Sequence, residues 1–76
     1  METFAERLEA SRRRGLLTQA ELARKACVSL ITVTRLENEN LNANPRPDTV
    51  KKLAGVLEVD PAWLLFGEME DVKLAA

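Results

Sequence analysis

The stretch LTQAELARKACVSLITVTRLEN, residues 17–38, determines the fold of this chain because it holds two short helical patterns on either side of a tight turn. Thr18 precedes the first pattern with Glu21 three residues later, and Ser29 precedes the second, so each helix has a side chain that can cap its first turn. Only three residues, 26–28, separate the two helices. This is the spacing of a helix-turn-helix.

The second of these helices opens with two aliphatic residues that its inner face does not need. Helical spacing places Val33 and Leu36 on the inner face, and Val28 can pack back from the turn. Aliphatic residues at the start of a helix usually serve packing, but here the packing positions are already occupied. We therefore expect Leu30 and Ile31 to point outward, where a partner can meet them.

Helical patterns also fill the rest of the chain, and no segment alternates convincingly at the period of a strand. Thr3 can cap a first helix that Gly15 ends. Pro47 suits the first position of a fourth helix, and the Asp-Pro pair at 60–61 begins a short fifth helix that Gly67 ends. The sequence predicts an all-α fold, a compact bundle of five short helices that includes the helix-turn-helix.

Composition is that of one small domain, which we place at residues 1–67, followed by an acidic tail at 68–76. The chain has 76 residues, one cysteine and no histidine, so it can form neither an internal disulfide nor a Cys/His zinc site. A lone thiol, charges among the first residues and no apolar run of membrane length predict a cytoplasmic protein without a membrane partner.

The net charge of −1 hides an uneven distribution along the chain. Residues 1–52 hold ten Lys or Arg against seven Asp or Glu, a balance of +3. Residues 53–76 hold one against five, a balance of −4. A polyanion could meet the first part while the second faces away or binds a partner, although solvated faces arranged by chance would give the same sums.

The stretch quoted above resembles the signature of the lambda-repressor-like DNA-binding family, also called the Cro/C1 or XRE class. The pattern P-x-P-x-x-x-x-x-L-A at 45–54 and the segment DPAWLLFG at 60–67 extend the resemblance over residues 4–67. The family resemblance implies that the third helix lies in the major groove of double-stranded DNA. It also implies that Cys27 and Glu58 stand where relatives have glycine, the first in a left-handed turn and the second after the fourth helix.

This docking makes four residues of the third helix candidates for base contact. Leu30 and Ile31 would press against thymine methyl groups, and Arg35 would bind guanine O6 and N7 with both arms of its guanidinium. Thr34 completes the set. Most relatives carry polar residues at the positions of Leu30 and Ile31, so a protein partner docking on this pair stays open as an alternative.

The resemblance also assigns phosphate contacts and one structural ion pair. The expected phosphate contacts come from helix starts and from the loop after the third helix: Gln19, Ser29, Asn38, Asn40 and Arg46. Arg12 and Glu37 match a partly buried ion pair that ties the first helix to the third in related domains.

Relatives bind DNA as dimers, and the last helix is the expected contact between copies. Trp63, Leu65 and Phe66 cannot all reach the core of so small a domain, which makes them candidates for a dimer interface. The resemblance implies a small dimeric transcriptional regulator, a repressor, that binds an inverted-repeat operator.

Two other classes of function are weighed against this one. A protein-binding module, an antitoxin or adaptor, could use the same fold and grip its partner through Leu30 and Ile31. An enzyme is not expected, because the chain lacks histidine, tyrosine, a Gly-rich phosphate loop and clustered carboxylates. We expect no cofactor, no metal and no small-molecule ligand.

Overall fold

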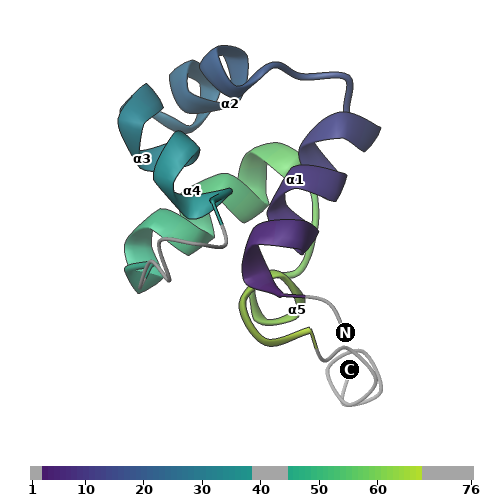
Figure 1. The fold of residues 1–76 in the computed structure, drawn as a ribbon. Helices are drawn as coiled ribbons and strands as arrows, with labels where there is room; N and C mark the ends of the chain where they lie inside the picture. The colour runs from purple at the N-terminus through teal and green to yellow at the C-terminus, as the bar shows by residue number, and fades with distance from the viewer. Residues whose placement is uncertain (1–2, 39–44, 68–76) are drawn as a thin grey trace.

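A computed structural model describes residues 3–38 and 45–67 of the chain. These residues form five α-helices and contain no strand (Figure 1). The helices are α1 Phe4–Arg14, α2 Gln19–Ala26, α3 Leu30–Leu36, α4 Pro47–Leu57 and α5 Pro61–Phe66. The prediction of an all-α bundle of five helices is confirmed.

Side chains fix where most of the helices begin. Thr3 and Thr18 each accept a hydrogen bond from the backbone of a glutamate three residues later, which bonds back to the threonine N–H, so α1 and α2 both start with a capping box. Ser29 Oγ accepts from Thr32 N at 3.1 Å at the start of α3. Asp60 accepts from two N–H groups of α5. These local bonds explain why short helices have defined ends.

One core holds the helices together. Each helix contributes a fully buried aliphatic side chain to it: Leu8, Leu22, Val33, Leu53 and Leu64. Full burial of each such side chain stabilises the fold by about 1.5–3 kcal/mol relative to leaving it exposed. Helices of six to eleven residues could not be stable alone in water, so their order comes from this shared core.

Three helices are followed within two residues by a left-handed residue that carries a side chain. Cys27 after α2 has φ of 59° and Glu58 after α4 has φ of 60°, as the resemblance implied for the turn at Cys27. After α1 the left-handed residue is Leu16, with φ of 59°, whereas Gly15 has an ordinary φ of −84°. Gly15 therefore follows α1 as predicted, but the chain reverses one residue later, where Leu17 N donates to Arg12 O at 3.1 Å.

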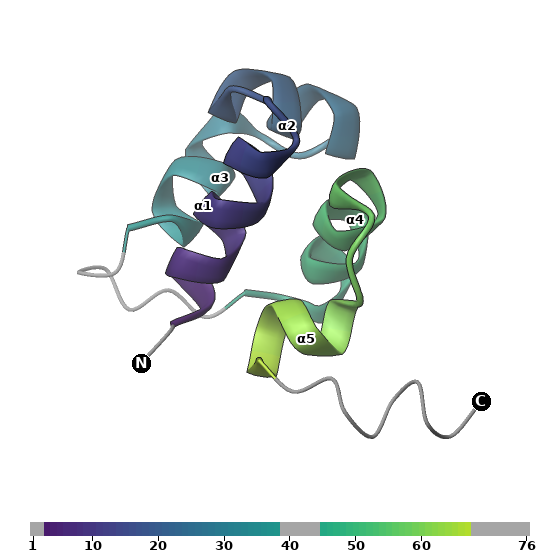
Figure 2. The ribbon, with the colours of Figure 1, turned by 90° about the vertical axis from the view of Figure 1, so that its right-hand side faces the viewer.

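The helices are arranged so that α5 lies at the end of the molecule opposite α2 (Figures 1 and 2). α3 packs against α2 and also contacts α1, while α5 packs against α4 and α1. One side of α3 consequently remains open to solvent at an edge of the molecule.

Candidate nucleic-acid interface

α3 has two faces of opposite character. Val33 is fully buried and Leu36 is 6% exposed, so the inner face of this helix is held in the core. On the outer face Leu30 is 47% and Ile31 67% exposed, and Arg35 is exposed as well. The prediction that the two aliphatic residues point outward is confirmed.

The turn before α3 sets this orientation. Val28 N donates to Ala23 O at 2.9 Å, and this bond spans the left-handed Cys27. The Val28 side chain is half-buried and packs against the core, which anchors the turn from inside. The small Ala23 and Ala26, each 4% exposed, let α2 and α3 approach closely. The turn therefore leaves little freedom for the outer face of α3 to rotate inward.

A hydrogen-bonded network joins α1, α2 and α3 beneath that face. Arg12 Nε donates to Glu37 Oε2 at 2.7 Å and Arg12 Nη2 to Glu37 Oε1 at 3.0 Å, a bidentate ion pair. Gln19 Nε2 donates to the same Glu37 Oε1 at 2.9 Å. Thr34 Oγ1 in turn donates to Gln19 Oε1 at 3.3 Å. Two candidate DNA contacts, Gln19 and Thr34, are thus linked to the Arg12–Glu37 ion pair.

The ion pair is largely removed from water. The side chains of Arg12 and Glu37 are 12% and 4% exposed. The hydrogen bonds that Arg12 donates to Glu37 raise the pKa of Arg12 above its already high ordinary value, against the opposing effect of burial. Arg12 Nη1 also donates to Leu17 O at 2.8 Å, so the guanidinium is bound on both arms. The charge of Arg12 is therefore paired inside the protein and is not available to bind DNA.

The residues predicted to contact phosphate differ in the hydrogen bonds that their side chains already form within the protein. Ser29 is bonded to Thr32 through both its cap bond and a 2.8 Å hydroxyl contact. The Gln19 side chain is engaged with Glu37 and Thr34, although an amide NH₂ keeps a second hydrogen to donate. Arg46 and Asn38 are exposed beside the loop that follows α3, and Asn40 lies outside the described residues.

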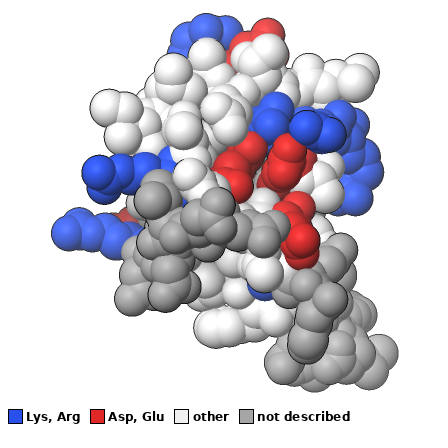
Figure 3. Space-filling model, in the orientation of Figure 1, with Lys and Arg blue, Asp and Glu red and all other residues white. Residues whose placement is uncertain are grey.

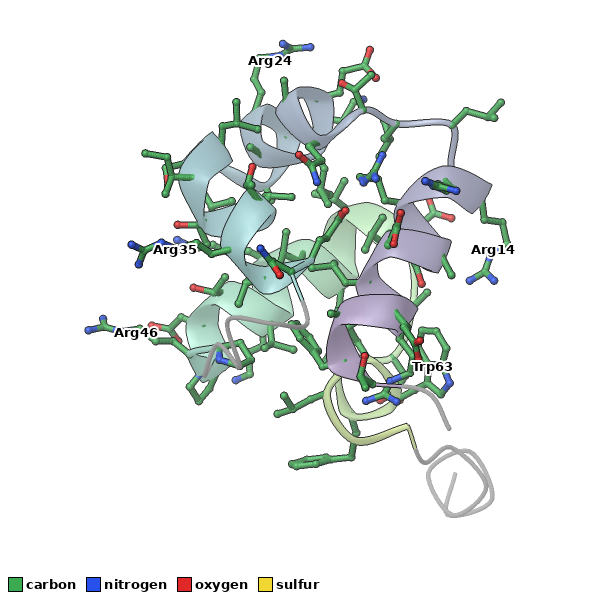
Figure 4. All side chains as sticks on the ribbon, viewed as in Figure 1. Arg14, Arg24, Arg35, Arg46 and Trp63 are labelled. Atoms are coloured by element: carbon green, nitrogen blue, oxygen red, sulfur yellow. The ribbon has the colours of Figure 1, made fainter. Side chains whose placement is uncertain are left out.

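Two exposed arginines lie on the side of the open face of α3. Arg35 and Arg46 point from the same edge of the molecule, whereas Arg14 points from the opposite side (Figure 4). Within residues 3–38 and 45–67 neither Arg35 nor Arg46 forms an ion pair. Figure 3 shows Lys and Arg side chains projecting at this edge. An aliphatic strip flanked by free guanidinium groups is chemically suited to a major groove.

The three candidate dimer residues do not lie on one surface. Phe66 is 69% exposed, and with the half-buried Leu65 it lines an apolar groove between α4 and α5. Trp63 is half-buried, packs against the core and lines a separate depression with Arg14 and Glu58.

Sequence reasoning missed one buried charge, Arg7. This residue is 6% exposed, and its Nε donates to Leu64 O at 3.0 Å while Nη2 donates to Leu65 O at 2.9 Å. The guanidinium thereby binds backbone carbonyls at the end of α5. A signal was present, since Arg7 is three residues after Phe4 and thus on the inner face of α1.

Two helices joined by a tight turn, with the second helix presenting an open face, define a helix-turn-helix domain. The sequence profile of the helix-turn-helix family matches residues 8–64. The chain therefore belongs to the lambda-repressor-like helix-turn-helix family.

Two relatives from Bacillus subtilis (strain 168) carry the same kind of sequence. The HTH-type transcriptional repressor RghR is 38% identical over 77 residues, which cover 99% of this chain and 56% of the relative. The uncharacterized HTH-type transcriptional regulator RghRB is 39% identical over 59 residues, which cover 78% of this chain and 42% of the relative. The chain thus spans about half the length of these relatives, which are named as regulators and not as enzymes.

Two solved structures have similar folds. The P22 c2 repressor, in complex with a synthetic operator, has a TM-score of 0.79 and 25% identity, over 90% of this chain and all of that one. The SinR protein, in a complex with the SinI protein, has a TM-score of 0.77 and 28% identity, over 95% of this chain and 66% of that one.

The described residues also contain no helix long and apolar enough to cross a membrane, and no group of three or more potential metal ligands.

Proposed function

We propose that residues 1–67 bind double-stranded DNA in a sequence-specific manner, with α3 in the major groove, as the DNA-binding domain of a cytoplasmic transcriptional repressor. The observation that carries the proposal is the two-sided character of α3. Its inner face is locked in the core, and its outer face presents exposed aliphatic side chains beside Arg35, whose guanidinium forms no ion pair with any described residue. The P22 c2 repressor, which has a similar fold, is known in complex with an operator.

In this proposal α3 supplies the base contacts. Leu30 and Ile31 bury their exposed apolar surface against thymine methyl groups, and Arg35 donates two hydrogen bonds to guanine. Thr34 is restrained by its bond to Gln19, so its methyl group and hydroxyl meet the groove in a fixed orientation.

The phosphate contacts come from both sides of α3. Gln19 donates its backbone N–H and its second amide hydrogen at the start of α2, where the helix dipole favours an anion. Ser29 lies at the start of α3, and Asn38 and Arg46 lie beyond its other end. Asn40, which is outside the described residues, completes the proposed set of phosphate contacts. The Arg12–Glu37 pair contacts no DNA and instead holds Gln19 in place.

The domain acts as a homodimer on an inverted-repeat operator. One module reads about half a site, and two copies place their recognition helices one turn of the duplex apart, about 34 Å. The exposed apolar residues of α5 supply the contact between copies.

Selection of bound sequences from a random DNA pool tests the proposal directly. We expect half-sites containing thymine and guanine, arranged as an inverted repeat. Affinity should fall steeply as salt is raised, because phosphate contacts release counterions. A salt-independent affinity would argue against groove docking.

A matched pair of variants then tests the assignment of Arg35. Arg35→Ala should weaken binding to the selected site by about 5- to 150-fold, the value of losing one bidentate base contact. Arg14→Ala removes the same charge from the opposite side of the molecule and should change affinity by less than about threefold. Equal losses in both variants would show that only net charge matters, and no binding at low salt would leave protein docking on Leu30 and Ile31.

A further inference from the structure

The outer side of the first turn of α3 is aliphatic, and the hydroxyl groups beside it are bonded to each other. Leu30 is 47% and Ile31 67% exposed, and neither side chain carries a polar atom. Ser29 Oγ and Thr32 Oγ1 lie 2.8 Å apart in a hydrogen bond. A surface of this kind recognises the shape and apolar character of a partner rather than a pattern of hydrogen-bond donors and acceptors.

The apolar feature that B-DNA presents in its major groove is the methyl group on C5 of thymine. Cytosine has the same ring position, and a methyl group added there projects into the groove at the same place. On the pyrimidine itself, thymine and 5-methylcytosine then differ in the groove only at position 4, where thymine accepts a hydrogen bond and 5-methylcytosine donates one. Distinguishing the two bases requires a polar side chain, which Leu30 and Ile31 cannot supply.

The charge beside this aliphatic surface favours DNA over an apolar protein partner. Arg35 and Arg46 point from the same edge of the molecule (Figure 4), and neither forms an ion pair with a described residue. Exposed guanidinium groups next to an apolar strip match a groove whose floor carries methyl groups and whose walls are phosphates. The occupant that fits both features is a methylated pyrimidine in duplex DNA.

Arg35 adds a guanine to the feature that is recognised. Residues four apart in a helix lie on the same side and are separated by about 6 Å along its axis, so Arg35 follows Ile31 on the outer face. Successive bases of one strand are about 3.4 Å apart, so these two side chains reach bases one or two steps apart. Guanine is the base that arginine binds with both arms of its guanidinium.

From these features we propose that α3 recognises the C5-methyl group itself, so that 5-methylcytosine one or two steps from a guanine is bound as thymine is. The inference rests on the proposed DNA binding and deepens it by naming the chemical group that is read. A consequence is that C5 methylation of cytosine in DNA creates binding sites for this domain. These sites have cytosine where the preferred sequence has thymine.

Two pairs of DNA duplexes, each differing by one methyl group, test the inference on the 76-residue chain. At each thymine position of the selected half-site in turn, the first pair has thymine or uracil opposite adenine, and the second has 5-methylcytosine or cytosine opposite guanine. Fluorescence anisotropy gives the four affinities. Burial of one methyl group changes affinity about fourfold, so a position that loses about fourfold on replacing thymine with uracil should gain about fourfold on methylating cytosine.

Variants of the chain test whether the methyl group is read by α3. The double variant Leu30→Ala with Ile31→Ala should reduce both methyl effects to less than about 1.5-fold, because alanine leaves little apolar surface to bury. Alanine favours helix, and circular dichroism should confirm that the variant is folded. Leu16→Ala shortens a leucine that is 89% exposed between α1 and α2, and as the matched control it should keep both methyl effects.

Three results would overturn the inference while leaving DNA binding itself intact. The first is that no thymine position responds to loss of its methyl group. The second is that thymine positions respond but 5-methylcytosine binds no better than cytosine. The third is that both methyl effects persist in the folded double variant, which would show that the methyl group acts through DNA shape. Failure of the unchanged chain to bind any duplex at low salt would instead refute the proposed DNA binding, and this inference with it.

Discussion

Replacing Glu37 with alanine should destabilise the domain severely, because it leaves the Arg12 charge without its main partner inside the protein. Glu37 accepts two bonds from Arg12 and one from Gln19, and its side chain is only 4% exposed. In the variant the guanidinium keeps only the bond to Leu17 O. Stranding a buried charge costs roughly 3–5 kcal/mol, whereas a domain of this size has a total stability of about 4–11 kcal/mol.

Urea denaturation measures this loss, with circular dichroism for helix content and the fluorescence of the single tryptophan, Trp63, for packing. We expect Glu37→Ala to lower the free energy of unfolding by about 3–5 kcal/mol. The double variant Arg12→Met with Glu37→Leu removes both charges and keeps the volume, so it should lie within about 2 kcal/mol of the unchanged chain or above it.

An exposed ion pair in the same helix provides the control. Arg13 and Glu9 are 2.8 Å apart, but their side chains are 72% and 39% exposed. Glu9→Ala should therefore cost no more than about 0.5 kcal/mol. Two results would contradict this reasoning: a loss of stability in Glu37→Ala as small as that in Glu9→Ala, or a double variant no more stable than Glu37→Ala. Either result would show that an unpaired buried Arg12 charge is not the cause of the destabilisation.

For three further substitutions the structure fixes the direction of the effect on stability. Ser11 Oγ is buried and has no hydrogen-bond partner among the described residues, so Ser11→Ala should raise stability by about 1 kcal/mol in urea denaturation; a loss would mean that the hydroxyl is satisfied. Glu58→Gly should relieve the left-handed strain at φ of 60° by about 0.5–1 kcal/mol, seen as a Tm increase of a few degrees; an unchanged or lower Tm would contradict this. The hydrogen bond from the Thr18 N–H lowers the pKa of Glu21. The stabilising effect of this bond is therefore complete above the unfolded pKa of Glu21, about 4.3, and is lost as pH falls through the lower folded pKa. The stability of the unchanged chain should accordingly fall more than that of Glu21→Gln between about pH 5 and pH 2, and parallel curves would exclude this role.

Local signals in the sequence were sufficient for the helices and their order. Each capping residue acts on a backbone N–H two or three positions away, so Thr18 and Ser29 mark helix starts wherever the chain lies in space. The period of apolar residues likewise gave the inner face of α3, because Val33 and Leu36 filled the available packing positions. The outward orientation of Leu30 and Ile31 followed by elimination, since a short helix has only one buried face.

Contacts between distant residues were decided by the tertiary structure alone. The bond from Arg7 to Leu64 spans 57 positions in the chain, and no local pattern could name its acceptor. Packing likewise brought the side chain of Gln19 within hydrogen-bonding distance of Glu37. It also placed Trp63 and Phe66 at two different surface depressions, although both residues lie on one short helix. Sequence thus determined which residues form each helix, because caps and periodicity act within a few residues. The tertiary structure determined which charged side chains are paired inside the protein and which aromatic side chain stays exposed, because those outcomes depend on how whole helices pack.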